Sequence, residues 1–316
     1  MTTCWSVEAQ RASLCNEWCP LFQNQQLPAS PRNGIFCKYC SCEGSCPKAV
    51  GFAPNVSHAE FRIAADTIGD AAAAGRPPPL LHLGRVLDGV SNNAEQALRR
   101  RGWASHRVLS FFNRMGNIGT EPAQLLAYAS AFSCASQPPR SVCEVGLFQG
   151  HSAALFLALT SRQSATYLSI DPHSYDFSRS VLSFLDASFP VRTTFIRGLS
   201  DRVLNATKTP AMRDCDLWSL DGLHKVDAVA RDARHALQAS PRVRTILMDD
   251  VTDSRTTLMR AQPSTRGCST AVDAWEVAKK EGLGSSSPFS SKCYLEGRKF
   301  GTPGWCSCWC IAQRGE

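Results

Sequence analysis

The chain has 316 residues, of which 43% are hydrophobic and 19% are charged. This composition is typical of a globular protein with a buried core, and it excludes wholesale disorder, collagen-like repeats and coiled-coil fibres. The formal net charge of +7 comes from 34 basic and 27 acidic residues, and no basic run is longer than Arg99–Arg101. We therefore expect a mildly basic, solvated surface and no nucleic-acid partner.

Cysteines gather at the two ends of the chain. Seven of the 15 fall in residues 1–46 and five in residues 268–316. Such ends are usual where small segments without a core need disulfides. The sequence predicts four regions: a cysteine-rich module (1–50), a linker with short helices (51–110), a main domain (111–290) and a cysteine-rich tail (291–316).

The first module has a C-x3-C pair at 15–19 and a C-x2-C-x-C-x3-C cluster at 37–46. Disulfides are the preferred interpretation; zinc is the alternative, because the segment has clustered thiols but no histidine. The tail cysteines at 306–310 are expected to bridge to this module or to Cys293. Buried Cys143 and Cys215, in the middle of the chain, are expected to stay reduced.

The beginning of the sequence does not settle the compartment. It shows no basic segment followed by an apolar run, so no signal peptide is visible, and no run approaches a membrane span. Either the protein is intracellular, with reduced or metal-bound cysteines, or the chain lacks its true N-terminus. The terminal cysteines favour an extracellular or secretory-pathway location.

From about residue 110, helical patterns alternate with short apolar strands. Alternation at this spacing predicts a doubly wound parallel α/β sheet with helices on both faces, whose ligands bind at the carboxyl ends of the strands. The expected helices are 91–100, 121–134, 152–159 and 226–237, and the expected strands are 142–145, 166–170, 194–196, 217–220 and 245–248.

Glycines and acidic residues follow these strands. Gly146 and Gly150, after the first strand, allow a tight turn and close approach of a ligand at a helix N-terminus. Their G-x3-G spacing is not the G-x-G-x-x-G of nicotinamide dinucleotide sites, which disfavours an oxidoreductase. Asp171, after the second strand, is placed to bind a ribose diol.

Three aspartates follow the fourth and fifth strands: Asp221, Asp249 and Asp250. Three carboxylates packed together are costly unless a cation or protons neutralise them. Oxygen ligands in a partly open cluster suit Mg²⁺. The sequence therefore predicts a magnesium site at this edge of the sheet.

Residues 113–280 resemble the class I S-adenosylmethionine-dependent methyltransferases, and among them the metal-dependent O-methyltransferases of the catechol and sugar types. Asn117–Leu126 resembles the helix leading into the cofactor domain, and Glu144–Ser152 matches the motif E-[LV]-G-x3-G-x-S. Trp275 resembles the tryptophan of a helix that follows the metal-site loop.

The resemblance implies a role for each matched residue. The implied cofactor-binding residues are Glu144, Gly146, Gly150, Ser152, Asp171 and Ser200. The implied metal ligands are Asp221, Asp249 and Asp250. His224 stands where catechol-type enzymes carry a lysine base and Lys225 is one residue later, so the base is left open between His224, Lys225 and Asp221.

The resemblance implies methylation of a hydroxyl group on a small molecule or carbohydrate, with S-adenosylmethionine as donor and Mg²⁺ assistance. A bound cation lowers the pKa of the hydroxyl, and a base then takes its proton. The alternative is a non-catalytic, cysteine-rich extracellular protein on a methyltransferase scaffold, because a fold does not fix a function. The sequence leaves the oligomeric state open.

Overall fold

A computed structural model describes a few positions between 12 and 42, and then residues 55–105, 107–108, 122–133, 138–189, 192–206, 210–223, 225–251, 271–280, 289–297 and 306–314. The chain divides into two compact units. The first comprises residues 1–138, 148–165 and 173–193, and the second comprises residues 139–147, 166–172 and 194–316.

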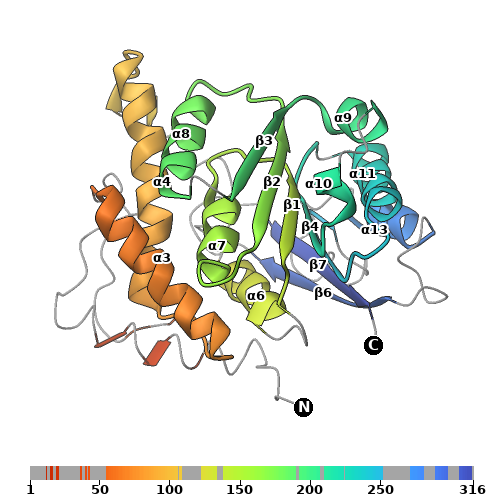
Figure 1. The fold of residues 1–316 in the computed structure, drawn as a ribbon, viewed down its shortest axis with the longest axis horizontal. Helices are drawn as coiled ribbons and strands as arrows, with labels where there is room; N and C mark the ends of the chain where they lie inside the picture. Colours follow the sequence, from red (N-terminus) through yellow and green to blue (C-terminus); the bar gives the residue numbers. More distant parts are fainter. Residues whose placement is uncertain are drawn as a thin grey trace. The chain divides into compact units, whose positions relative to one another are not determined.

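A seven-stranded sheet has the strand order β3-β2-β1-β4-β5-β7-β6 (Figure 1). Its strands are β1 (Ser141–Val145), β2 (Thr166–Asp171), β3 (Thr193–Arg197), β4 (Leu217–Leu220), β5 (Thr245–Asp249), β6 (Phe289–Gly297) and β7 (Cys306–Arg314). β1 pairs in parallel with β2 and β4, and β4 pairs in parallel with β5. β7 runs antiparallel to both β5 and β6. The predicted α/β sheet is therefore confirmed, but it is mixed rather than entirely parallel, because β7 runs antiparallel to its two neighbours.

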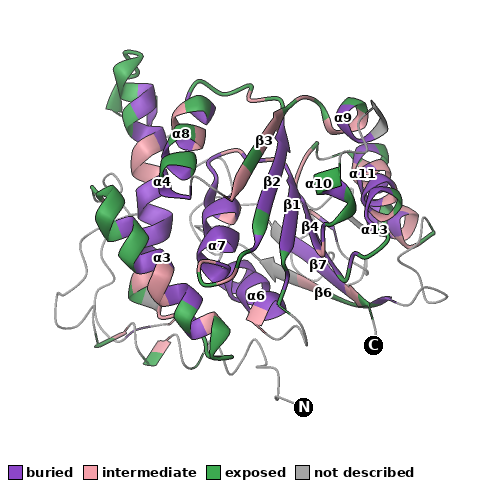
Figure 2. Cartoon of the chain, in the orientation of Figure 1, coloured by how far each residue is buried: buried purple, intermediate pink, exposed green. Residues whose placement is uncertain are grey.

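The register aligns the ends of the central strands. Val145, the last residue of β1, pairs with Ile170 on β2 and with Leu220 on β4. The residues that follow β1, β2 and β4 consequently emerge at one edge of the sheet, where a doubly wound sheet binds its ligands. β1 is buried along its whole length, as Figure 2 shows.

Four helices of the second unit are described: α9 (Ser200–Ala206), α10 (Pro210–Arg213), α11 (Val226–Ala239) and α13 (Ala271–Ala278). α11 packs against β4, α9 and α13. Trp218 of β4 and Trp275 of α13 are almost completely buried in the core of this unit, and the Trp218 indole donates to Ser240 Oγ at 2.8 Å. The tryptophan singled out in the sequence thus serves this core.

The cysteine-rich tail is part of the sheet. The boundary predicted at residue 290 falls inside β6, and β6 and β7 form a hairpin joined to β5. Cys293 and Cys310 are paired within this hairpin, with Cα atoms 4.0 Å apart, as the sequence predicted. The ring of Tyr294 stacks on Trp309 at 5.4 Å between centroids. In the sequence, the dense cysteines of this segment obscure the strand pattern of β6 and β7.

The first unit consists of packed helices. They are α3 (His58–Ala73), α4 (Leu80–Arg100), α6 (Pro122–Ser133), α7 (His151–Leu159) and α8 (Ser178–Ser188). Residues 51–110 are therefore more than a linker: α3 and α4 pack on each other and on α7 and α8, and the predicted helix 91–100 is the second half of α4. None of the described helices is long and apolar enough to cross a membrane.

The cysteines whose side chains the structure describes are all disulfide-bonded. In the first module Cys15 pairs with Cys40 and Cys19 with Cys42, which agrees with the disulfide interpretation. Cys143 and Cys215 are also paired, with Cα atoms 5.8 Å apart, so the prediction that they stay reduced is wrong. The sequence separation of 72 residues hides this pairing: the cysteines meet only once β1 and the segment before β4 come together.

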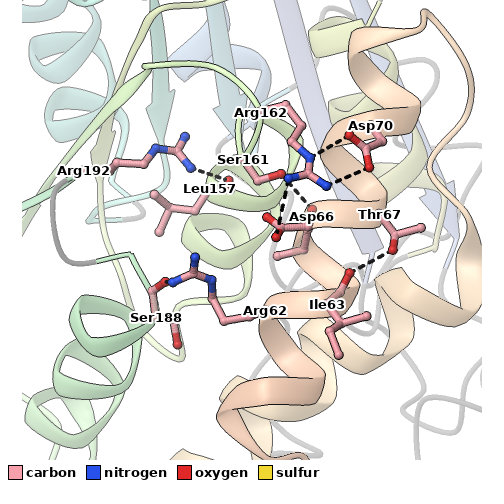
Figure 3. Close-up of polar contacts among 11 residues, drawn as sticks. Arg62, Ile63, Asp66, Thr67, Asp70, Leu157, Ser161, Arg162, Ser188 and Arg192 are labelled. Carbon is pink, nitrogen blue, oxygen red and sulfur yellow. Dashed lines mark hydrogen bonds and ion pairs between the residues drawn. The ribbon is translucent and has the colours of Figure 1, made fainter.

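Two arginines near the end of α7, Arg192 and Arg162, make different kinds of contact (Figure 3). The Arg192 guanidinium donates to the carbonyl oxygens of Thr160 (2.7 Å), Ala165 (3.0 Å) and Leu157 (3.3 Å). Leu157 lies in the last turn of α7 and Thr160 is its C-cap, so Arg192 adds a charged donor to carbonyl groups at the end of the helix. Arg162 instead forms an exposed ion pair with Asp70 on α3, with Nε 2.6 Å from Oδ1.

We expect Arg192→Met to destabilise the protein more than Arg162→Met. The first change removes a charged donor from three carbonyl groups, and a hydrogen bond to a charged group is worth about 1.5–3 kcal/mol. Exposed ion pairs such as Arg162–Asp70 contribute little. Urea unfolding followed by circular dichroism measures both variants; equal midpoints would contradict the capping role of Arg192.

Candidate active site

The turn after β1 requires glycine at its first position. Gly146 has φ +92°, and its amide donates to the carbonyl oxygen of Ile170 at 2.9 Å. A Cβ atom on Gly146 would lie 1.9 Å from the carbonyl oxygen of Asp221. The backbone of this turn therefore lies directly against the backbone that follows β4, and only a residue without a side chain permits that approach.

Asp171 connects two turns at the carboxyl edge of the sheet. It is the last residue of β2 and is 6% exposed. Its Oδ2 accepts a hydrogen bond from the amide of Leu147 at 2.8 Å, and its carbonyl oxygen accepts one from the amide of Gly198 at 3.0 Å. The structure thus brings Asp171 together with the turn at Gly146 and with the turn that precedes Ser200.

Gly150 and Ser152 lie at the start of α7. Gly150 has φ +74° and is the N-cap of the helix, with no side-chain hydrogen bond to the first helical amides. Ser152 is partly buried, and the neighbouring His151 is buried with its Nε2 2.7 Å from Ser91 Oγ on α4. A helix N-terminus without a side-chain cap has amide donors available for an anionic ligand.

Glu144 lies inside the sheet. It is fully buried, its carboxylate accepts a hydrogen bond from the hydroxyl of Tyr167 on β2, and its neighbours on β2 and β4 are Ser169 and Ser219. Burial, followed by the nearby negative charge of Glu144, raises the pKa of Tyr167 well above its ordinary value. This contact makes Glu144 a structural partner of Tyr167, and its role in cofactor binding stays a prediction.

Asp221 and Asp249 form a close pair. Their side chains are hydrogen-bonded, and burial raises the pKa of Asp221 well above its ordinary range. The negative charges of Asp249, Glu144 and Asp171 raise this pKa further. A hydrogen bond between two carboxyl groups requires a shared proton, so the pair is a place where a proton or a cation is favoured.

The predicted three-aspartate metal site is not supported. Asp250 has φ +56°, and its amide donates to Asp249 Oδ1 at 3.0 Å. Among the described residues, no group of three or more His, Cys, Asp or Glu side chains is arranged to hold a metal ion. Two of the three predicted ligands, Asp221 and Asp249, are therefore in contact, and a direct role for the third is not seen.

Of the three base candidates, the structure describes two. His224 lies outside the described residues. Lys225 is exposed and is the N-cap of α11, without a side-chain hydrogen bond to the helix. Asp221 is the only one of the described candidates that lies beside a second carboxyl group.

Sequence reasoning missed two residues of this region, Tyr167 and Asp232. Ser200, the first residue of α9, forms a side-chain hydrogen bond with Asp232 of α11. A signal for Asp232 was available: it falls on the same helical stripe as Ala228, Ala236 and Ala239, all of which are buried. For Tyr167 no signal was available, because an aromatic residue in a strand is expected to be core.

Comparisons with known proteins agree with this architecture. Residues 143–251 match a family described as a methyltransferase domain. A search of curated protein sequences found no match.

Solved structures with a similar fold include three methyltransferases. The O-methyltransferase TomG from Streptomyces achromogenes, in complex with S-adenosylmethionine, has 17% identity and a TM-score of 0.48, covering 73% of this chain and 90% of its own. An O-methyltransferase from Bacillus cereus, in complex with S-adenosylhomocysteine, has 14% identity and a TM-score of 0.45, with coverages of 71% and 91%. The methyltransferase PaMTH1 from Podospora anserina, bound to S-adenosylhomocysteine, has 13% identity and a TM-score of 0.44, with coverages of 72% and 88%. Likenesses this weak assign no substrate.

Proposed function

We propose that the chain, whose residues 143–251 match a methyltransferase-domain family, is a class I S-adenosylmethionine-dependent methyltransferase. It would transfer the methyl group of this cofactor to a hydroxyl oxygen of a small molecule or carbohydrate. The proposal depends on one observation: the Gly146 turn, Asp171 and the Asp221–Asp249 pair lie together at the carboxyl edge of the sheet. One side of this edge offers backbone turns for a cofactor, and the other offers carboxyl groups for an acceptor.

The chemistry is an in-line displacement. The acceptor oxygen forms a bond to the methyl carbon, the bond from carbon to the sulfonium sulfur breaks, and the hydroxyl proton passes to a base. Asp221 suits the role of base, because a carboxylate with a raised pKa takes up a proton more readily than an ordinary one. His224 and Lys225 are the other proposed bases.

The proposal includes assistance by a divalent metal, held by two carboxylates and not by the three that the sequence predicted. Asp221 and Asp249 would hold the ion, because two adjacent carboxyl groups that repel each other favour a cation, and Mg²⁺ commonly uses one or two carboxylates with waters completing its shell. The ion would lower the pKa of the acceptor hydroxyl. The non-catalytic alternative is not favoured, since Asp171 and the carboxyl pair are all kept together at the ligand-binding edge.

Asp249→Asn is expected to reduce methyl transfer by about 10²-fold or more, because it removes a ligand or a proton-binding partner of Asp221. Affinity for S-adenosylmethionine should change little. The measurement is transfer of a labelled methyl group to a panel of diols, catechols and sugars, beside calorimetric cofactor binding. Asp227→Asn, on the exposed face of α11, is the matched control.

The same assay in excess chelator separates the two forms of the proposal. Loss of transfer, restored by added Mg²⁺, supports metal assistance. Undiminished transfer overturns metal assistance and leaves Asp221, His224 or Lys225 to act as the base alone. No transfer to any hydroxyl acceptor, together with transfer to amines or thiols, would overturn O-methylation itself.

A further inference from the structure

Asp232 is a buried acid on α11, whose other buried residues are five alanines and His235. Its side chain is 2% exposed, and it shares its stripe on α11 with Ala228, Ala236 and Ala239. A carboxyl group removed from water costs free energy unless its contacts compensate for the lost hydration. An alanine at this position would avoid that cost, so the contacts of Asp232 point to its role.

The Asp232 carboxyl touches two loops at the carboxyl edge of the sheet. It forms a side-chain hydrogen bond with Ser200, which begins α9 after β3. It also lies against Gly222, where an added Cβ atom would be 3.3 Å from Asp232 Oδ2. Gly222 directly follows Asp221, so one carboxyl group contacts both the turn expected to bind cofactor and the loop that carries Asp221.

The electrostatic surroundings keep this group sensitive to pH. Burial raises the pKa of Asp232 to about 6, and the negative charge of Asp201 on α9 contributes in the same direction. The hydrogen bond from Ser200 and the charge of Arg231 lower it. α13 also packs on α11, and its charged residues are Asp273 and Glu276. At neutral pH the group is mostly ionised and remains buried.

We propose that Asp232 is a positioning residue whose carboxylate holds the Ser200 turn and the Gly222 loop in the arrangement that binds the cofactor. This inference rests on the proposed function. A charged acceptor holds a serine hydroxyl more firmly than a neutral one, so the ionised form fixes Ser200 and the protonated form fixes it less well. The loops then bind the cofactor more tightly above the pKa of Asp232 than below it.

The test is calorimetric binding of S-adenosylmethionine to the full chain and to Asp232→Asn at about pH 5 and about pH 8. Asparagine keeps the shape and an acceptor oxygen but cannot carry the charge. We expect the variant to bind about threefold to tenfold more weakly at the higher pH, the scale of coupling between contacting residues, and nearly equally at the lower pH. Asp227→Asn, which is exposed on the same helix, should match the unaltered protein at both.

Stability separates positioning from a purely structural role. The folded state holds the Asp232 proton more tightly than the unfolded state does, so stability contributed by this group is lost as pH rises from about 4 toward 6. Asp232→Asn should therefore melt at a higher temperature than the unaltered protein at about pH 8 and at a similar one at about pH 4. Tighter folding with weaker binding is a combination that a structural role alone does not produce.

Ser200→Ala provides the second variant. It should weaken binding at about pH 8 by the same factor as Asp232→Asn, and the double variant should lose no more than either single one, because both act through one contact. Equal affinities of Asp232→Asn and the unaltered protein at both pH values would overturn the inference alone. If the unaltered protein binds no S-adenosylmethionine at either pH, the proposed function fails and the inference fails with it.

Discussion

Replacing Gly146 by alanine is expected to lower the free energy of unfolding by about 3–5 kcal/mol. Two costs combine. Gly146 has φ +92°, a conformation that costs an L-residue about 1–2 kcal/mol. The new Cβ would also lie 1.9 Å from the carbonyl oxygen of Asp221 and 2.7 Å from its carbonyl carbon, so the backbone after β4 must move.

Gly75→Ala is the matched control. Gly75 also has a positive φ, +64°, but an added Cβ would meet no atom within 4 Å. Its replacement therefore has only the backbone cost, about 1–2 kcal/mol. Urea unfolding of both variants gives the comparison, and a Gly146 variant no less stable than the Gly75 variant would contradict the close approach of the two backbones.

Asp171→Ala is expected to weaken binding of S-adenosylmethionine by about 1.5–3 kcal/mol, or about tenfold to 150-fold. The substitution removes the proposed acceptor for the ribose diol. It also removes the acceptor for the Leu147 amide, which lies 2.8 Å from Asp171 Oδ2, and so loosens the turn after β1. Isothermal titration calorimetry measures the affinity, and thermal denaturation checks that the variant is folded.

Asp171→Asn distinguishes these two contributions. Asparagine keeps an oxygen that can accept from Leu147 but loses the charge that favours a diol. If Asp171 binds the ribose, the unaltered protein should prefer the cofactor over its 2′-deoxy analogue, and this preference should shrink in Asp171→Asn. An unchanged affinity in Asp171→Ala would refute the ribose assignment.

The strands at the centre of the sheet could be predicted from the sequence, because each is a short apolar run bounded by turn residues. β4 has the predicted bounds, β1, β2 and β5 are each one residue longer at one end, and β3 is one residue longer at each end. Gly146 and Asp171 could also be placed at the edge of the sheet, since the carboxyl ends of parallel strands share an edge.

Features that depend on tertiary contact could not be predicted. The packing of α3 and α4 cannot be recognised from the sequence, because polar residues and the Gly75–Pro79 segment obscure their buried faces. β6 and β7 were hidden by cysteines, whose pattern is read first as disulfide framework. Cys143 and Cys215 meet across a chain separation of 72 residues.

The candidate site shows the same division. A carboxylate after a strand can be recognised locally, but the number of carboxyl groups that touch depends on loop geometry. Asp250 directly follows Asp249 and has φ +56°, a backbone geometry that the sequence does not reveal. Among the described residues, no group of three side chains is arranged to hold a metal ion. Asp232 is easily missed, because polar residues on an amphipathic helix are usually exposed, although it lies on the same stripe of α11 as three buried alanines.

Calorimetric titration of the purified chain with S-adenosylmethionine, and in parallel with NAD, tests the central claim most directly. A class I methyltransferase site should bind S-adenosylmethionine and its product S-adenosylhomocysteine with one site per chain, and it should not bind NAD, because the turn after β1 lacks the glycine spacing of a pyrophosphate site. Binding of NAD, or no binding of either methyltransferase ligand, would contradict the account.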